Sequence, residues 1–377
     1  MSRTLTQREL LVAESKTEGP RALRDELEAF LDRASRLVDT HPWLVVVAMH
    51  EYFRCIYPAD PHLPFDEQET PLARVRRVLG SCRRLLEARQ HIASYFEHGA
   101  DVSRSARSNT PPRRAEAPTQ QVYGRLWDQF EREHYLTESV ELLKARLVPT
   151  GLKEPMFTDR IVLDAGCGSG RFTMAMAMMG ARLAHGVDLG ATSLENARRV
   201  AKEAGLPNVE FRVGDALALP YDDQSFDFVW CNGVLHHTQD IERGLRELYR
   251  VLKPGAQAFV YLYGDGGLFW HSRRRMRPIM QRIPQEYTMA VLGLLGMPRN
   301  RFIFADTWYV PIERHTGRAE LEVLLSRTGF SPVRKVVGAR STDLDRAVEF
   351  GGEQARLLWG EGEHRYLVMR PCSGDRA

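Results

Sequence analysis

The segment Ile161–Arg171, IVLDAGCGSGR, constrains the fold more than any other part of the chain. An apolar run ends in Asp164 and is followed by three glycines at alternate positions, Gly166, Gly168 and Gly170. Glycines let the backbone turn sharply and approach a ligand without a Cβ in the way. A helix that begins directly after such a turn directs its free N–H groups and its positive end at the ligand. The segment therefore predicts a strand, a ligand-binding turn and a helix.

The spacing of the glycines separates the candidate ligands. A dinucleotide fingerprint has the pattern G-x-G-x-x-G, but here the third glycine comes one place early and Arg171 stands where that fingerprint has glycine. A Walker phosphate loop is excluded because no Gly-Lys-Ser/Thr follows. Asp188 ends the second predicted strand, where an acidic group meets ribose hydroxyls. Asp215 follows the third, where a carboxylate can accept from an adenine amino group and the N–H of Ala216 can reach a ring nitrogen.

Strands and helices alternate after this segment, which predicts βαβ units and a parallel sheet with right-handed crossovers. The predicted strands are Arg160–Ala165, Leu183–Asp188, Val209–Val213, Phe226–Cys231 and Ala256–Tyr263, with two more near Pro332–Val337 and His364–Arg370. The predicted helices are Arg171–Met179, Ser193–Ala204, Ile241–Leu252 and Glu320–Thr328.

Composition removes several classes of partner. A formal net charge of +3 over 377 residues gives no case for nucleic acid. The five cysteines are scattered with no C-x-x-C pair, so neither disulfides nor a metal site is indicated, and a cytoplasmic location fits best. The first ten residues hold no apolar stretch of signal-peptide type. The longest apolar runs are too short or interrupted to span a membrane, so we expect no membrane partner.

The segment Ile161–Tyr263 resembles class I S-adenosylmethionine-dependent methyltransferases, in particular the group that includes ubiquinone/menaquinone-biosynthesis and small-molecule methyltransferases. Ala256 departs from this pattern, which usually has a second glycine after LKPG. The matching pieces are LDAGCGSG (Leu163–Gly170), GVD (Gly186–Asp188), GDA (Gly214–Ala216), DALALPYDDQSFDFV (Asp215–Val229), NGVLHH (Asn232–His237) and ELYRVLKPGA (Glu247–Ala256).

The resemblance implies a Rossmann-like α/β fold and S-adenosylmethionine as cofactor, with S-adenosylhomocysteine as product. It places Gly166–Gly170 under the methionine part, Asp188 on the ribose, Asp215 and Ala216 on the adenine, and Asn232–Leu235 beside the sulfonium. Asp164 is more typical of a residue that holds the loop than of one that contacts the cofactor. Cys167 and Cys231 are more typical of small buried apolar residues than of a metal or redox site. The predicted cofactor-binding set is Asp164, Gly166, Cys167, Gly168, Gly170, Asp188, Leu189, Asp215, Ala216, Asn232, Gly233 and Tyr123.

Candidate catalytic and acceptor-binding residues come from the segments around this core. His236, His237 and His315 are candidate bases, needed only if the acceptor must lose a proton, although the histidine pair also suits a wall of the cleft. Asp306 and Glu313 suit a cationic amine or guanidine acceptor, or surface ion pairs; Tyr123 or Tyr135 suits the cofactor carboxylate. The predicted acceptor-binding set is Trp127, Tyr135, Tyr263, Asp306, Trp308, Tyr309 and Glu313, aromatic members of which are also ordinary packing residues.

The domain organisation follows from composition. We expect an N-terminal helical domain at 1–100, a flexible linker at 101–119, a methyltransferase domain at 120–371 with an acceptor-side insertion at 266–317, and a tail at 372–377. Helices are predicted from about Pro20, at Pro42–Tyr57, at Pro71–Phe96 and at Gln121–Leu147. The first has one apolar face, formed by Leu23, Leu27, Phe30, Leu31, Ala34 and Leu37.

The fold expected is thus a seven-stranded, mostly parallel sheet with helices on both faces, an N-terminal all-α region and a helical insertion after strand five. The leading functional hypothesis is methyl transfer to N, O or C of a small molecule, plausible in specialised biosynthesis. The alternatives are a protein or RNA methyltransferase and a cofactor-binding regulatory subunit without turnover. The N-terminal helices suit a homodimer interface.

Overall fold

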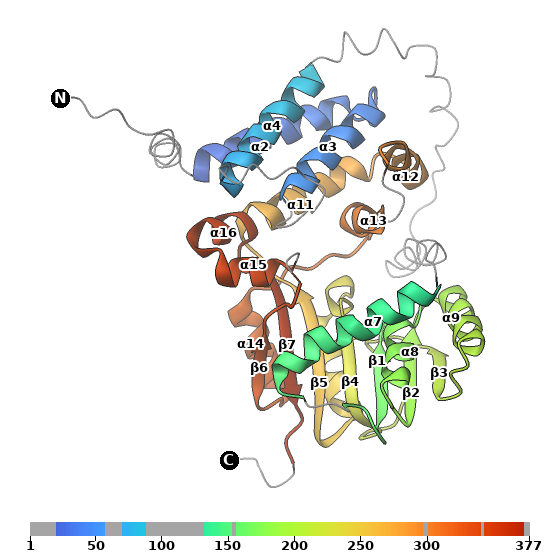
Figure 1. The fold of residues 1–377 in the computed structure, drawn as a ribbon. Coiled ribbons are helices and arrows are strands. Elements are labelled where there is room, and N and C mark those ends of the chain that lie inside the picture. Colours follow the sequence, from blue (N-terminus) through green and yellow to red (C-terminus); the bar gives the residue numbers. More distant parts are fainter. Residues whose placement is uncertain are drawn as a thin grey trace, which may run out of the picture. The chain divides into compact units, whose positions relative to one another are not determined.

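The computed structural model describes residues 20–56, 70–87, 132–152, 156–296, 301–340 and 343–372. The chain divides into two compact units, each built from three separate stretches (Figure 1). The helical unit comprises Met1–Arg113, Gly266–Tyr309 and Phe350–Gly360, and the sheet unit comprises Arg114–Asp265, Val310–Glu349 and Glu361–Ala377. No helix among the described residues is long and apolar enough to cross a membrane.

The sheet unit contains one seven-stranded sheet in the order β3-β2-β1-β4-β5-β7-β6. Only β7 runs antiparallel to its neighbours β5 and β6, while β1 to β5 pair in parallel. This confirms the predicted fold class. The strands are β1 (Ile161–Ala165), β2 (Leu183–Asp188), β3 (Val209–Val213), β4 (Phe226–Asn232), β5 (Leu252–Tyr263), β6 (Val333–Val336) and β7 (Glu363–Met369).

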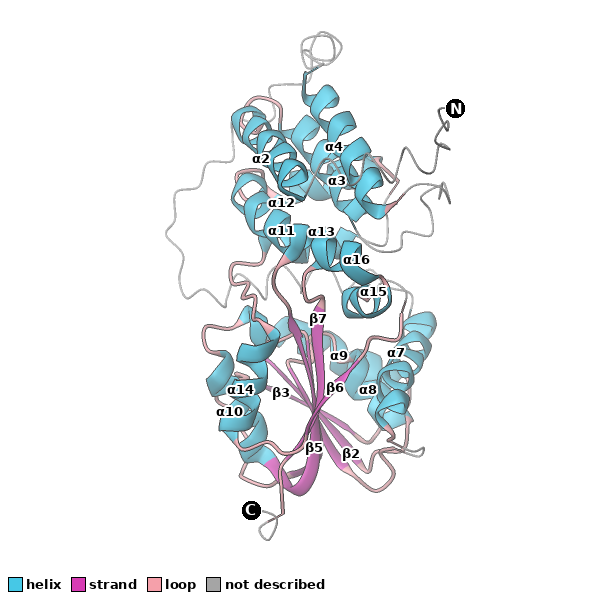
Figure 2. Ribbon diagram, turned by 90° about the vertical axis from the view of Figure 1, so that its left-hand side faces the viewer, coloured by secondary structure: helices cyan, strands magenta, loops and turns pink. Residues whose placement is uncertain are grey.

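Helices cover both faces of this sheet (Figure 2). On one face lie α7 (Arg132–Leu147), α8 (Arg171–Met178) and α9 (Ala191–Glu203). Apolar residues of α7 and α8 share a cluster with residues of β1, β4 and β5, and Ala201 of α9 packs in a second cluster with residues of α7, α8 and β3. On the other lie α10 (Ile241–Val251) and α14 (Arg318–Thr328). Because parallel strands all end at one edge, the loops after β1, β2, β3 and β4 gather there.

Strand β5 begins four residues before the predicted Ala256, directly after α10. Leu252 has extended dihedral angles (φ −71°, ψ 140°) and pairs with Phe226 of β4. The cause is Pro254, which disfavours helical conformation in Lys253, the residue before it, so the helix cannot continue beyond this point. The α10 helix therefore runs into the strand with no loop between them.

The helical unit joins the N-terminal helices to those that follow β5. Its helices are α2 (Pro20–Leu37), α3 (Pro42–Ile56), α4 (Pro71–Glu87), α11 (Gly267–Met280), α12 (Gln285–Leu294), α13 (Arg301–Tyr309) and α16 (Gly352–Trp359). The predicted apolar face of α2 is buried in full. The sheet unit contributes a further short helix, α15 (Leu344–Phe350), and the 3₁₀ turns η2 (Val148–Thr150) and η3 (Leu235–His237).

An aromatic cluster ties the parts of the helical unit together. Phe53 of α3 contacts Phe269 of α11 at 5.9 Å between ring centroids, and Phe304 and Trp308 of α13 at 5.4 and 6.1 Å. Trp359 Nε1 of α16 donates to the carbonyl of Ile56 at 2.7 Å. The segment after β5 thus shares one hydrophobic core with the N-terminal helices.

Candidate active site

The loop between β1 and α8 has the geometry that its glycines predicted. Gly166, Gly168 and Gly170 have φ of +77°, +54° and +76°, in the left-handed region that favours glycine. A Cβ on Gly166 would lie 2.4 Å from Cγ2 of Val234, and one on Gly170 would lie 2.5 Å from the ring of Phe211. Both positions therefore need glycine for space as well as for conformation.

Asp188, the last residue of β2, joins two loops at the carboxyl edge of the sheet. Its Oδ2 accepts from the N–H of Gly168 at 2.9 Å, and its Oδ1 accepts from the N–H of Gly190 at 2.8 Å. Burial raises the pKa of Asp188, and these backbone hydrogen bonds act in the opposite direction. Each carboxylate oxygen can accept more than one hydrogen bond, so the same carboxylate can also receive ribose hydroxyls.

Asp164 lies beneath this loop at the end of β1. It is 2% exposed, and its Oδ2 accepts from Thr173 Oγ1 of α8 at 2.8 Å. Burial, with a smaller contribution from the charge of Asp188, raises the pKa of Asp164 to about 7, against the Thr173 hydrogen bond. This arrangement favours a role in holding the loop against α8 over direct contact with a ligand.

Replacing Asp164 with asparagine is expected to change how the free energy of unfolding depends on pH. The folded-state pKa of about 7 lies above the unfolded value of about 3.9, so the native protein binds an extra proton between these values. The stability contributed by this proton is complete below pH ~4 and is lost as pH rises through ~7. Urea titrations should show Asp164→Asn gaining up to ~4 kcal/mol on wild type between pH 4 and pH 8. A difference that is the same at both pH values would contradict the assignment.

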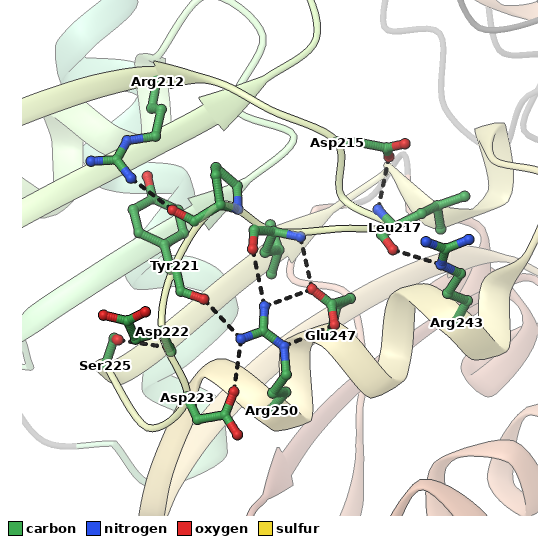
Figure 3. A network of polar contacts seen from close by, with 12 residues as sticks. Arg212, Asp215, Leu217, Tyr221, Asp222, Asp223, Ser225, Arg243, Glu247 and Arg250 are labelled. Atoms are coloured by element: carbon green, nitrogen blue, oxygen red, sulfur yellow. Dashed lines mark hydrogen bonds and ion pairs between the residues drawn. The ribbon is translucent and has the colours of Figure 1, made fainter.

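The Asp215 loop after β3 is fixed by its own backbone and by α10 (Figure 3). Oδ1 of Asp215 accepts from the N–H of Leu217 at 2.8 Å, and the carbonyl of Leu217 accepts from Arg243 Nε at 2.8 Å. The side chain of Ala216 is buried beside them. The two predicted adenine-binding residues are thus held in a defined turn at the edge where β1 and β2 end.

Arg250 of α10 holds the rest of this loop, with its guanidinium at the centre of the network in Figure 3. It donates to the carbonyls of Leu219 and Tyr221 at 3.0 and 2.8 Å and to Asp223 Oδ1 at 2.9 Å. Glu247 pairs with Arg250 and accepts from the N–H of Leu219 at 2.7 Å. The LPYDD and ELYR pieces that carried the family resemblance are therefore joined in one network of hydrogen bonds and ion pairs.

The segment after β4 lies between the glycine loop and β5. Asn232 pairs in register with Tyr261 of β5, and Val234 lies against Gly166. Gly233 has φ of +79°. The predicted sulfonium-side residues are thus adjacent to the predicted methionine-side loop.

The paired histidines of η3 have opposite tautomers. The N–H of Tyr263 donates to His236 Nδ1 at 3.2 Å, so the proton of a neutral His236 is on Nε2. His237 Nδ1 lies 2.9 Å from the carbonyl of Ile312, which requires Nδ1 to be protonated and leaves the lone pair on Nε2. His236 also stacks on the ring of Tyr263 at 3.6 Å between centroids.

His315 and Glu313 lie next to this histidine pair. His315 Nε2 is 2.8 Å from Glu313 Oε1, and the two side chains are 5% and 2% exposed. The ring of His315 is 6.4 Å from that of Tyr263, and the N–H of Arg314 donates to the carbonyl of His236. The structure therefore brings together Tyr263, Glu313 and all three predicted catalytic histidines.

Three of the predicted acceptor residues belong to the helical unit. Asp306, Trp308 and Tyr309 belong to α13 of the helical unit, where Asp306 pairs with buried Arg273 at 3.0 Å and Trp308 is fully buried. Tyr309 shares a 2.5 Å hydrogen bond with Thr288. Tyr123 and Trp127 lie outside the described residues, as does the side chain of Tyr135 on α7. An acceptor role for these residues stays a prediction.

Cys167 and Cys231 are free, buried thiols, and burial raises the pKa of both. Both are therefore protonated at neutral pH, as expected of small apolar packing residues.

Sequence reasoning missed a buried charged cluster at the edge of β7. Arg365, 1% exposed, pairs with Asp343 at 3.0 Å, with Glu363 at 2.7 Å and with Asp345. Tyr261 Oη donates to Glu363 Oε1 at 2.7 Å. No local spacing signals this cluster, because its members come from β5, β7, α15 and the residue before α15.

A mostly parallel sheet with this strand order, a glycine turn after β1 and carboxylates after β2 and β3 defines a Rossmann-like enzyme that binds a nucleoside cofactor at the carboxyl edge. Residues 163–260 match the family model described as "Methyltransferase domain". Demethylmenaquinone methyltransferase of Listeria monocytogenes is 42% identical over 178 residues, which are 46% of this chain and 71% of that protein. The chain belongs to the class I S-adenosylmethionine-dependent methyltransferases.

Two further proteins are similar to part of this chain. Norajmaline N-methyltransferase of Rauvolfia serpentina is 34% identical over 131 residues, covering 33% of this chain and 45% of the plant enzyme. The structure of an S-adenosylmethionine-dependent methyltransferase from Thermotoga maritima, described as a possible histamine N-methyltransferase, has 18% identity and a TM-score of 0.41. That comparison covers 67% of this chain and 99% of the other.

Proposed function

We propose that this protein transfers the methyl group of S-adenosylmethionine to a small-molecule acceptor that carries a hydroxyl or amine proton. The observation that carries the proposal is the Asp188 carboxylate, which fixes the glycine loop and the loop after β2 at one edge of the sheet. Two of the similar proteins are named demethylmenaquinone methyltransferase and norajmaline N-methyltransferase. These names support a small acceptor.

The chemistry asks little of the protein beyond alignment. The methyl group is attached to a positively charged sulfur, so the thioether leaves without acid assistance. The protein must hold the nucleophile in line with the S–CH3 bond and exclude water, and positioning of this kind contributes ~7–11 kcal/mol. A protic nucleophile must also lose its proton, which calls for a base within hydrogen-bond reach.

His237 is the residue whose geometry suits this base best. Its Nδ1–H is held by the carbonyl of Ile312, so the lone pair on Nε2 can accept a proton. In His236 the corresponding nitrogen carries a proton, because its Nδ1 already accepts from a backbone N–H. Glu313, which pairs with His315, is the candidate to bind a cationic acceptor.

The first test is binding and transfer with purified protein. Calorimetry with S-adenosylmethionine and S-adenosylhomocysteine should show saturable binding of both compounds. Incubation with methyl-labelled cofactor and panels of phenols, hydroquinones and amines should then place label in a small-molecule product. Binding without transfer to any acceptor would favour a regulatory subunit, and label in added RNA or protein would favour the macromolecular alternative; either outcome would overturn the proposal.

Replacing His237 with glutamine is expected to reduce kcat for the acceptor found in that screen by about 10²–10⁴-fold, the usual contribution of a general base. The affinity for S-adenosylmethionine should not change. His185→Gln is the matched control, since His185 of β2 contacts Tyr221 and Glu210 and not the residues after β4. Equal kcat in His237→Gln and wild type would exclude this base.

We further place the protein in the cytoplasm, where thiols stay reduced, because none of its five cysteines forms a disulfide. A homodimer through the N-terminal helices remains a prediction, although the apolar face of α2 is already used within the helical unit.

A further inference from the structure

A buried arginine on α7 contacts Asn232, a residue of the predicted cofactor site. Arg146 is 8% exposed, and its Nη1 donates to Oδ1 of Asn232, the last residue of β4. Its Nε has no hydrogen-bond partner in the described part of the chain. Burying a guanidinium is costly unless it is well paired, so an apolar residue would serve α7 better if packing were its only role.

This contact fixes which way the Asn232 amide faces. A guanidinium has donors only, so it selects the amide oxygen and turns the two Nδ2–H groups to the opposite side. The guanidinium of Arg146 lies 5.7 Å from the ring centroid of Tyr261, the β5 residue paired with Asn232. The amide oxygen of Asn232 therefore faces Arg146, and its two N–H groups face away from Arg146.

Arg146 stays charged at neutral pH although its surroundings disfavour the charge. Arg365 lies 4.8 Å from the same Tyr261 ring and is itself surrounded by three carboxylates. Burial first, and then the charge of Arg365, lower the pKa of Arg146 to about 10, against smaller opposing effects of Asp343 and Glu363. The guanidinium thus stays protonated at neutral pH and acts as a donor.

From these contacts we propose that Arg146 is a positioning residue: it holds the Asn232 amide with its N–H groups directed at the amino-acid end of bound S-adenosylmethionine. The proposal rests on the proposed function. Two N–H donors suit the carboxylate, which is the one anionic group of that cofactor, and they do not suit its ammonium or sulfonium. Arg146 acts through Asn232 and does not itself contact the cofactor.

The test compares two ligands that differ in the amino-acid part. S-adenosylhomocysteine carries it, and methylthioadenosine lacks it. Arg146→Met should weaken S-adenosylhomocysteine binding by about tenfold or more, as for loss of a hydrogen bond to a charged group, and should change methylthioadenosine binding less than about twofold. Asn232→Asp keeps an acceptor for Arg146 but removes the N–H groups, so it should show the same selective loss without lowering Tm.

Two controls separate positioning from general damage. Arg334 donates to the carbonyl of Thr150 just beyond the end of α7 and has no contact with Asn232, so Arg334→Met should leave both affinities unchanged. Arg146→Met should add nothing in an Asn232→Ala background, whereas Arg146→Lys should recover part of the lost affinity. Equal weakening of both ligands, unchanged binding, or additive effects in the double variant would overturn the role of Arg146. Failure of the wild type to bind S-adenosylhomocysteine would instead defeat the proposed function.

Discussion

Replacing Asp188 with alanine is expected to weaken S-adenosylmethionine binding by at least about 100-fold. The variant loses two backbone hydrogen bonds, to Gly168 and Gly190, that set the distance between the loops after β1 and β2. It also loses the carboxylate proposed to accept the ribose hydroxyls. A hydrogen bond to a charged group contributes ~1.5–3 kcal/mol, so loss of even two of them corresponds to about two orders of magnitude or more.

Calorimetry with wild type and Asp188→Ala measures this effect directly. Glu210→Ala is the matched control, because Glu210 is a carboxylate on the adjacent strand β3 whose side chain is 59% exposed. The far-ultraviolet circular dichroism of Asp188→Ala should match that of wild type, since the strand interior is unchanged. If Asp188→Ala bound S-adenosylmethionine as tightly as wild type, Asp188 would not belong to the cofactor site.

Replacing Phe53 with alanine is expected to destabilise the helical unit by ~3–5 kcal/mol, the usual cost of deleting a buried aromatic ring. Phe53 is 1% exposed and contacts rings on both α11 and α13. The cavity therefore opens where the N-terminal helices meet the segment after β5. Removing residues 1–100 altogether should leave α11 and α13 without their apolar partners and expose them to proteolysis.

Urea denaturation followed by circular dichroism, with limited proteolysis of residues 267–309, tests this expectation. Leu294→Ala on α12 is the control, because Leu294 is 89% exposed and belongs to the same unit. If residues 267–309 were equally protected in Phe53→Ala and in wild type, the shared core would not support them. That result would exclude cooperative unfolding of the helical unit.

The sheet was predictable because its signals are local. A strand that ends in Asp164 and runs into Gly166 and Gly170 has few other uses, and the alternation of strands with helices fixes a parallel arrangement. The sequence predicted that α10 ends at Leu252 and that β5 starts at Ala256, whereas α10 ends at Val251 and β5 starts at Leu252. There the apolar pattern continues through Leu252, while the restriction that Pro254 imposes on the backbone is what ends the helix.

The contacts that cross the chain were not predictable. Arg146 and Asn232 are 86 positions apart, and nothing around either one indicates a partner. Trp308 and Asp306 are of residue types that often bind acceptors, yet Trp308 contacts Phe53 and Asp306 pairs with Arg273. Periodicity identifies which face of a helix is buried, but the identity of the covering element is a property of the whole fold.

The split composition of the helical unit has a consequence for biosynthesis of the chain. Helix α3 ends at Ile56, while its partner α11 starts only at Gly267. At ribosomal rates of ~5–20 residues per second, about 10–40 s pass between the synthesis of α3 and that of α11. During this time the apolar surfaces of the N-terminal helices remain exposed. Chaperone engagement during translation should therefore concentrate on nascent chains of intermediate length and subside once synthesis has passed Tyr309.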